Sequence, residues 1–255
     1  MGKYKIGITE AGDAGIDLSW VDKLNTVDGA IVISKRFTPE FISAVLSNKD
    51  KLIVHATVTG YGGNVLEPFV PVVAEEKKNS DGLVAAGFPK EKIVIRVDPI
   101  IPTQKGLERA ERVMLLFLEA GYRRYRVSVL DNYPHVKNRF TRVGLPVLYD
   151  GNFYPSSEDF QKVDQMLARV KSVAKSDYRL TQSEFSIECC AEPSIQEAAH
   201  TGCISAYDLA LLGLDPAEAD DKGHQRRDCL CYSGKTELLT HKHRCPNGCL
   251  YCYWK

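Results

Sequence analysis

The last residues of the chain contain three cysteines, Cys245, Cys249 and Cys252, in a C-x3-C-x2-C pattern. Three thiolates on one tight loop can bind three irons of a cubane cluster, because each supplies one soft anionic ligand. The fourth iron then has no protein ligand and is free to bind a small molecule. Gly248 allows the backbone to fold around such a cluster, and Pro246 stiffens the start of the loop.

A zinc knuckle is the alternative for this triplet. Structural zinc sites usually have four protein ligands, and the nearby candidates for the fourth are His241 and His243. Thiolate-rich sites suit both zinc and iron–sulfur clusters, but this spacing suits the cluster. We therefore expect a 4Fe–4S cluster at the triplet.

A second set of cysteines precedes the triplet and consists of Cys190, Cys203, Cys229 and Cys231. Four thiolates complete a 4Fe–4S or 2Fe–2S cluster, or a closed tetrahedral zinc site. We expect an auxiliary iron–sulfur cluster that transfers electrons or stabilises the fold, with zinc and unligated thiols as the alternatives. Cys189 is left over or takes the place of Cys190, because neighbouring side chains on a strand point to opposite faces.

The distribution of the cysteines and the bulk composition indicate the class of protein. None of the eight cysteines lies before Cys189 in 255 residues, whereas a disulfide scaffold would spread them through a small secreted chain. Lysine plus arginine and aspartate plus glutamate both number 33, so the molecule as a whole has no electrostatic footprint for nucleic acid or membrane. There is no apolar run of membrane-spanning length and no signal-peptide core. We expect a soluble cytoplasmic protein with metal-binding cysteines and no membrane partner.

Before Cys189 the sequence alternates short β-branched runs with amphipathic helical segments, which predicts a parallel sheet with right-handed crossovers. Six such units favour a (βα) barrel, full or partial and TIM-like. We expect the barrel domain over 1–188 and a cysteine-rich cluster-binding extension, packed on the barrel, over 189–255. The expected strands are Tyr4–Thr9, Gly29–Ser34, Lys51–Thr59, Lys92–Asp98, Arg124–Leu130 and Phe185–Cys190; the expected helices are Leu18–Asn25, Pro39–Ser47, Val65–Ala86, Gly106–Ala120, Glu158–Ala174, Ser194–Ala199 and Ala206–Leu212; Asn132–Asp150 is expected to be a long loop that acts as a lid.

The triplet, with the aromatic Tyr251 directly before Cys252, resembles the cluster motif of the radical S-adenosylmethionine (SAM) superfamily. The resemblance implies that the open iron binds the amino and carboxylate groups of SAM. It also implies that one electron from the cluster cleaves the sulfonium and yields a 5′-deoxyadenosyl radical, which abstracts hydrogen from a substrate. An electron donor such as flavodoxin or ferredoxin is implied as well. Most members carry the motif after their first strand, whereas here three residues follow Cys252.

Further short segments share a likeness with one family: Val54–Gly62, Val94–Pro99, Val127–Asp131, Cys190–Glu192, Gly202–Ile204, and Gln225–Arg226 leading into Cys229 and Cys231. Through these segments the chain resembles, over nearly its full length, an uncharacterised bacterial domain family of unknown function that ends in this triplet. The segment Thr9–Asp13 departs from the arginine-rich sequence that the family has there.

The carboxyl ends of the expected strands supply the pocket candidates, because the loops there converge on one face of a βα barrel. Arg96 and Asp98 alternate along one strand, so both can face inward, either as a buried ion pair or as functional groups. A glycine-rich turn after the third strand either lets the backbone approach the methionine or adenosine part of the cofactor or is a plain loop. The expected catalytic residues are Glu10, Arg96, Asp98 and Asp131, and the expected cofactor-binding residues are Thr57, Thr59, Gly60, Gly62 and Tyr251.

Three basic runs contain or adjoin aromatic residues: Tyr122–Arg126, Lys137–Arg142 and His241–Arg244. Such runs are usually solvated, but the mixture also suits phosphate contact with base stacking. We therefore expect a radical SAM enzyme that acts on a nucleotide base or base adduct, as in DNA modification. The alternatives are a radical SAM enzyme acting on a small metabolite or peptide, and a non-enzymatic iron–sulfur or zinc protein in electron transfer or DNA binding.

Overall fold

The computed structural model describes residues 2–223, 228–239 and 245–254. Within these ranges a single sheet of parallel strands has the order β7-β6-β5-β4-β3-β2-β1-β8. Each strand from β1 to β6 pairs with the next one along the chain, and β8 returns to pair with β1. The strands are β1 (Ile6–Ile8), β2 (Gly29–Ser34), β3 (Leu52–Thr57), β4 (Ile93–Ile100), β5 (Arg124–Val129), β6 (Ser186–Cys189), β7 (Ala199–His200) and β8 (Lys235–Glu237).

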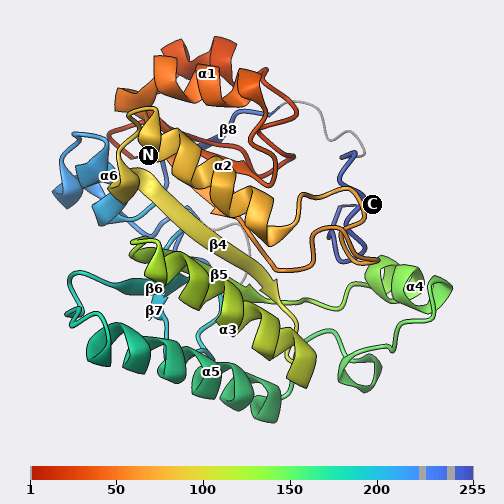
Figure 1. Cartoon of the computed structure of the whole chain (residues 1–255). Coiled ribbons are helices and arrows are strands. Elements are labelled where there is room, and N and C mark those ends of the chain that lie inside the picture. Colours follow the sequence, from red (N-terminus) through yellow and green to blue (C-terminus); the bar gives the residue numbers. More distant parts are fainter. Residues whose placement is uncertain (1, 224–227, 240–244, 255) are drawn as a thin grey trace.

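Helices cover the sheet, and α2, α3 and α5 lie side by side across one of its faces (Figure 1). Local chemistry fixes where they begin: Thr38 Oγ1 accepts a hydrogen bond from the Phe41 amide at 3.1 Å, which caps α1. None of the helices in the described ranges has the length and apolar character that crossing a membrane requires. The α-helices are α1 (Pro39–Ser47), α2 (Val73–Ala85), α3 (Gln104–Glu119), α4 (Pro134–Arg142), α5 (Ser157–Ser176) and α6 (Ala206–Leu211); the 3-10 helices are η1 (Val21–Thr26), η2 (Lys49–Lys51), η3 (Lys90–Lys92), η4 (Tyr149–Gly151) and η5 (Pro216–Glu218).

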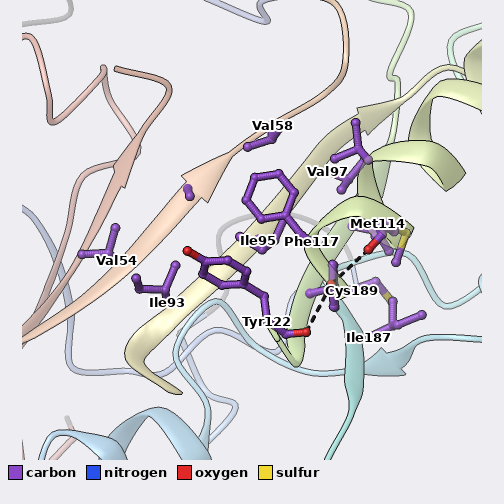
Figure 2. Close-up of a cluster of buried hydrophobic side chains, with 14 of the residues drawn as sticks. Val54, Val58, Ile93, Ile95, Val97, Met114, Phe117, Tyr122, Ile187 and Cys189 are labelled. Carbon is purple, nitrogen blue, oxygen red and sulfur yellow. Dashed lines mark hydrogen bonds between the residues drawn. The ribbon is translucent and has the colours of Figure 1, made fainter. Parts of the chain in front are cut away.

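The larger apolar core lies between the sheet and these helices. Val54 and Ile95 of neighbouring strands belong to this core together with Met114 and Phe117 of α3, as Figure 2 shows. Cys189 is completely buried in the same core, so its thiol is on the helix-facing side of β6. Burying one large aliphatic or aromatic side chain contributes about 1.5–3 kcal/mol, so this core supplies much of the stability of the fold.

The opposite face of the sheet is apolar only in part. Ile31 and Ile53 form a second buried cluster there with Leu209 of α6 and with Tyr232. Towards the carboxyl ends of the strands the same face carries charged side chains, among them Arg96. Strand residues alternate between the two faces, so these apolar and charged side chains share one face. The apolar cluster therefore lies beside the charged carboxyl ends of the strands.

Two expected helices differ from the structure. The expected helix over Val65–Ala86 begins only at Val73, because Pro68 and Pro71 lack the amide hydrogen that a helix interior needs. In place of the expected helix Leu18–Asn25 there is the 3-10 helix η1, which begins at Val21.

Further differences concern the region around the cysteines. Ser194–Ala199 is not helical, since Ala199 begins β7 and pairs with Glu188 of β6. The expected loop Asn132–Asp150 contains α4, which has a proline in its first turn, where the missing amide hydrogen is not needed. The segment 189–255, expected as an extension packed on the strands, supplies β7 and β8 to the same sheet.

Candidate metal and substrate site

A cavity of about 780 Å³ opens at the carboxyl ends of the strands. Polar side chains reach the cavity from strands β2 to β5 and from the residues that directly follow β1 and β6. The chain segments after β6 and after β8 bring cysteines to the same place. Figure 1 shows α4 and the C-terminal segment at this end of the molecule, towards which β4 points. All three cysteines of the triplet and all four of the second set line this one cavity: Cys190, Cys203, Cys229, Cys231, Cys245, Cys249 and Cys252.

The triplet forms a short loop on one wall of the cavity. The amide of Gly248 donates to Cys245 O at 3.4 Å, and the amide of Cys252 donates to Cys249 O at 3.2 Å. Gly248 has φ +64°, a conformation that favours glycine, and it packs against Phe69. Burial raises the pKa of Cys249 to about 12 and also raises that of Cys245, so these thiols are protonated unless a metal binds.

Asn247, between the first two cysteines of the triplet, fastens this loop to the ends of β1 and β2. Its side-chain amide donates to Asp13 Oδ2 at 2.7 Å and its oxygen accepts from Arg36 Nε at 2.6 Å. Asp13 is held in turn by Ser34, whose hydroxyl donates to Oδ1 at 2.6 Å. Asn247 is 2% exposed, so its hydrogen bonds form away from water and position the loop firmly.

Glu67 fastens the other end of the loop. Its carboxylate accepts hydrogen bonds from Lys35 at 2.8 Å, from Thr59 at 2.7 Å and from the hydroxyl of Tyr251. Lys35 also lies over the Tyr251 ring, 5.6 Å from its centroid. Glu67 is 1% exposed, and a carboxylate at such depth requires this number of donors. The residue before the third cysteine is therefore fixed by a buried charge network.

The second set comes together from separate segments. The sulfurs of Cys190, Cys203 and Cys231 all lie within 4.8 Å of one another, and the first two are 3.6 Å apart. Cys229 is buried and adjoins Cys231, and its sulfur is 4.0 Å from Gly223 O. This group of cysteines could hold a metal ion.

Charged residues surround the second set. Hydrogen bonds from Cys190 and Cys231 lower the pKa of Cys203, and the cations Lys235 and Arg126 lower it further. Lys235 Nζ is 3.9 Å from Cys231 Sγ. These positive charges favour thiolates over thiols, and metal ligation needs thiolates.

The expected catalytic residues line the cavity as two ion pairs and one further carboxylate. Arg96 Nε donates to Asp98 Oδ2 at 2.6 Å, and the two side chains are 19% and 23% exposed. Burial opposes the charge of Asp98, but Arg96 and the Ser128 hydroxyl lower its pKa. Glu10 pairs with Lys235 at 2.6 Å. Asp131 lies on the same lining.

The expected cofactor-binding residues divide into two groups. Thr57 and Tyr251 belong to the described cavity lining, whereas Thr59, Gly60 and Gly62 do not. Thr59 donates to Glu67, and a Cβ on Gly62 would lie 1.8 Å from Pro71 O. The glycine-rich turn therefore packs against its own loop.

The run Tyr122–Arg126 is not a basic surface. It belongs largely to β5, where Arg124 and Arg126 are 4% and 3% exposed. Both guanidinium groups bond to Glu188, at 2.9 Å and 2.7 Å, and Arg124 also pairs with Asp208 at 2.6 Å. The run is therefore not the solvated face that this composition usually indicates. Its two arginines on the inward side of β5 are buried and paired, and Arg126 also lines the cavity. The run His241–Arg244, with His241 and His243, lies outside the described residues.

Aromatic side chains form a rim at the cavity. Tyr133, Tyr253 and Trp254 line it, with ring centroids 6.4 Å apart for the first pair and 5.0 Å for the last. Arg139 of α4 holds the C-terminal segment in place by donating to Cys252 O at 2.6 Å and to Trp254 O at 2.7 Å. Arg142, on the same helix, is exposed and lines the cavity.

Three candidate functional residues were not predicted from the sequence: Asn247, Glu67 and Lys235. A signal existed for Asn247, since it is a polar residue inside the cysteine motif. Lys235 and Glu67 carry no local signal, because their partners lie far away in the chain, as in the pair of Lys235 with Glu10.

These features define an α/β protein with one parallel sheet and a cysteine-lined cavity at the carboxyl ends of its strands. The chain belongs to a family described as a domain of unknown function, DUF1848, whose model matches residues 19–254. The match includes both cysteine sets. A comparison with curated proteins finds no match.

Proposed function

We propose that this chain is a radical SAM enzyme whose 4Fe–4S cluster is held by Cys245, Cys249 and Cys252. The observation that carries the proposal is that the three thiols line a cavity together with charged strand-end residues. Three thiolates leave one iron of a cubane for a small molecule, and the cavity volume is typical of ligand pockets. The strand order β1 to β6 is that of consecutive βα units, so we also infer a partial TIM-like barrel.

The donor set suits a cluster better than a single ion. Among the described residues, the sulfurs that lie within 4.8 Å of one another are those of Cys190, Cys203 and Cys231, and not those of the triplet. A cluster binds each thiolate through a different iron, so its ligands stand farther apart than the ligands of one ion. When bound, the cluster supplies one electron that cleaves SAM to a 5′-deoxyadenosyl radical.

The residues of the chain hold and orient the reactants. Asn247 and Tyr251 fix the loop from both ends through their buried partners. The guanidinium of Arg96 offers a planar fork that suits the carboxylate of the cofactor or a phosphate of the substrate. Glu10 and Asp131 supply carboxylates for an amino or hydroxyl group.

The proposed substrate is a nucleotide base or base adduct. The support is the aromatic rim of Tyr133, Tyr253 and Trp254, which suits stacking of a planar ring, with Arg142 exposed beside it for a phosphate. We further propose a cytoplasmic setting, where a flavodoxin or ferredoxin supplies the electron. The second cysteine set is a second metal centre, and an auxiliary iron–sulfur cluster is one of the forms that it can take.

Anaerobic reconstitution tests the proposal. The chain is loaded with iron and sulfide, incubated with SAM and dithionite, and the 5′-deoxyadenosine formed is measured by mass spectrometry. We expect formation that depends on both SAM and reductant. A chain with an intact cluster and no 5′-deoxyadenosine would instead be a non-enzymatic iron–sulfur protein.

A further inference from the structure

The second cysteine set lies where the two ends of the sheet meet. Cys190 follows β6, Cys203 follows β7, and Cys231 precedes β8. β7 and β8 occupy opposite ends of the strand order, and the described residues show no ladder between them. Their flanking segments are nevertheless in contact, because a Cβ on Gly202 would lie 2.1 Å from Leu230 O. The sulfurs thus gather across a junction where the described residues form no β-ladder.

The distances between the sulfurs are those of ligands around one ion. A zinc–sulfur bond of about 2.3 Å gives a tetrahedral site whose sulfurs are about 3.8 Å apart. Cys190 and Cys203 are 3.6 Å apart, and Cys231 lies within 4.8 Å of both. Around an iron–sulfur cluster, thiolates on different irons would be more widely spread. Three sulfurs this close together fit a single ion without moving apart.

A fourth thiol and two cations lie beside these three sulfurs. Cys229 is 3% exposed and adjoins Cys231 in a C-x-C pair, and its sulfur moves towards the other three when it completes the site. Four thiolates around a divalent ion leave two net negative charges, and two cations lie near them. Lys235, which also pairs with Glu10, is 3.9 Å from Cys231 Sγ. Arg126, which also pairs with Glu188, has a buried Nε with no hydrogen-bond partner among the described residues. Such cations stabilise an anionic thiolate centre.

We propose that Cys190, Cys203, Cys229 and Cys231 hold one tetrahedral zinc ion that links the two edge strands of the sheet. Zinc suits the site because it accepts four soft thiolates in tetrahedral geometry and brings no redox change. The ion replaces the missing β7–β8 ladder with metal–ligand bonds. The inference is independent of the chemistry at the triplet.

The test uses the full chain with Cys245→Ala, Cys249→Ala and Cys252→Ala combined, so that the second set is the remaining metal site under study. We expect metal and sulfide analysis to give one zinc per chain, with neither iron nor sulfide. Replacement of zinc by cobalt should produce the intense visible absorption of tetrahedral thiolate-bound cobalt. Iron in this variant, or no metal, would overturn the proposal.

Two further variants assign the ligands. Cys203→Ser should lose the zinc, whereas Cys189→Ser should keep it, because Cys189 is buried on the opposite face of β6. If Cys203→Ser does not fold, zinc is instead removed with a chelator from the folded variant that lacks the triplet cysteines. We expect the Tm of that variant to fall by roughly 5 °C or more. An unchanged Tm after complete zinc removal would contradict the link between the edge strands. The assay of 5′-deoxyadenosine on the unaltered chain reports on the triplet alone, so the two proposals fail separately.

Discussion

The terminal triplet and the second cysteine set meet at one cavity but are assembled in different ways. The triplet occupies eight consecutive residues, and side chains such as Asn247 and Tyr251 attach this loop to distant parts of the sheet. The second set is collected from three separate segments by the strands themselves. A local loop can hold a bulky cofactor and leave one side open, whereas ligands converging from the sheet edges enclose a small ion. The difference suggests a reactive centre at the triplet and a structural one at the second set.

Removal of the triplet cysteines should have the largest effect on activity. We expect Cys245→Ala, Cys249→Ala or Cys252→Ala each to abolish SAM cleavage, because a cubane missing one of three thiolates loses its anchor. Zinc at the second set should be unchanged. The measurement is 5′-deoxyadenosine yield beside metal content, with Cys189→Ala as the control that keeps both. A near-normal yield of 5′-deoxyadenosine from any of the three variants would contradict the proposal that these cysteines hold the cluster.

A smaller loss should follow when the loop keeps its cysteines but loses its attachment. Asn247→Ala removes the hydrogen bonds to Asp13 and Arg36. Residues that orient metal ligands typically affect affinity or activity by about 10–100-fold, and we expect a loss of SAM cleavage in this range. Iron retention after a desalting step should fall as well. Asn138→Ala, on the exposed side of α4, is the matched control. Equal iron retention and activity in both variants would show that the attachment is dispensable.

The sequence was informative where chemistry is local or periodic. β-branched runs with turns predicted the strands from β1 to β6 closely, and Thr38 with Pro39 marked the start of α1. The triplet was visible because its ligands share one loop. The edge strands β7 and β8 are two and three residues long, too short to show a period. Distant pairs such as Glu10 with Lys235 depend on the complete fold, and no local pattern indicates them.

Arg96 and Asp98, in the lining of the same cavity, allow a further test. We expect Arg96→Lys to reduce turnover by about tenfold or more, because an ammonium cannot reproduce the planar fork of a guanidinium. The fold and both metal contents should remain, since the Arg96–Asp98 pair is partly open to the cavity. Tm and 5′-deoxyadenosine yield are measured together on Arg96→Lys and Asp98→Asn, with Arg112→Lys on the exposed face of α3 as the control.

The opposing account treats Arg96 and Asp98 as a structural ion pair. Breaking a fully buried pair costs about 3–5 kcal/mol, which would appear as a large fall in Tm with a proportionate loss of activity. Unchanged Tm with lost activity supports a role at the ligand. The two outcomes therefore decide whether this wall belongs to the reactive centre or to the scaffold.

The two cysteine regions also differ in how completely their buried carboxylates are paired, and we expect this difference to have the smallest effect, on stability. Beside the second set, Glu188 is bonded to Arg124 and Arg126. Near the triplet, Glu76 is 6% exposed, and one of its oxygens has no hydrogen-bond partner in the part of the chain that the structure describes. Burial raises the pKa of Glu76 well above its usual value, and Lys35 offsets this only in part. The protonated form therefore suits the folded state better than the carboxylate.

Glu76→Gln should consequently stabilise the protein near neutral pH. A carboxyl with a raised folded pKa favours folding below its unfolded pKa, near 4.5, and this contribution is lost as the pH rises through the folded pKa. Glutamine resembles the neutral carboxyl and requires no proton, so we expect a gain of about 1 kcal/mol at pH 7 and almost none at pH 4. Urea unfolding at both pH values measures it, and Glu75→Gln, one residue earlier and exposed, is the control. A loss of stability at pH 7 would mean that the charged form of Glu76 has a role in holding the triplet region, as Glu67 does.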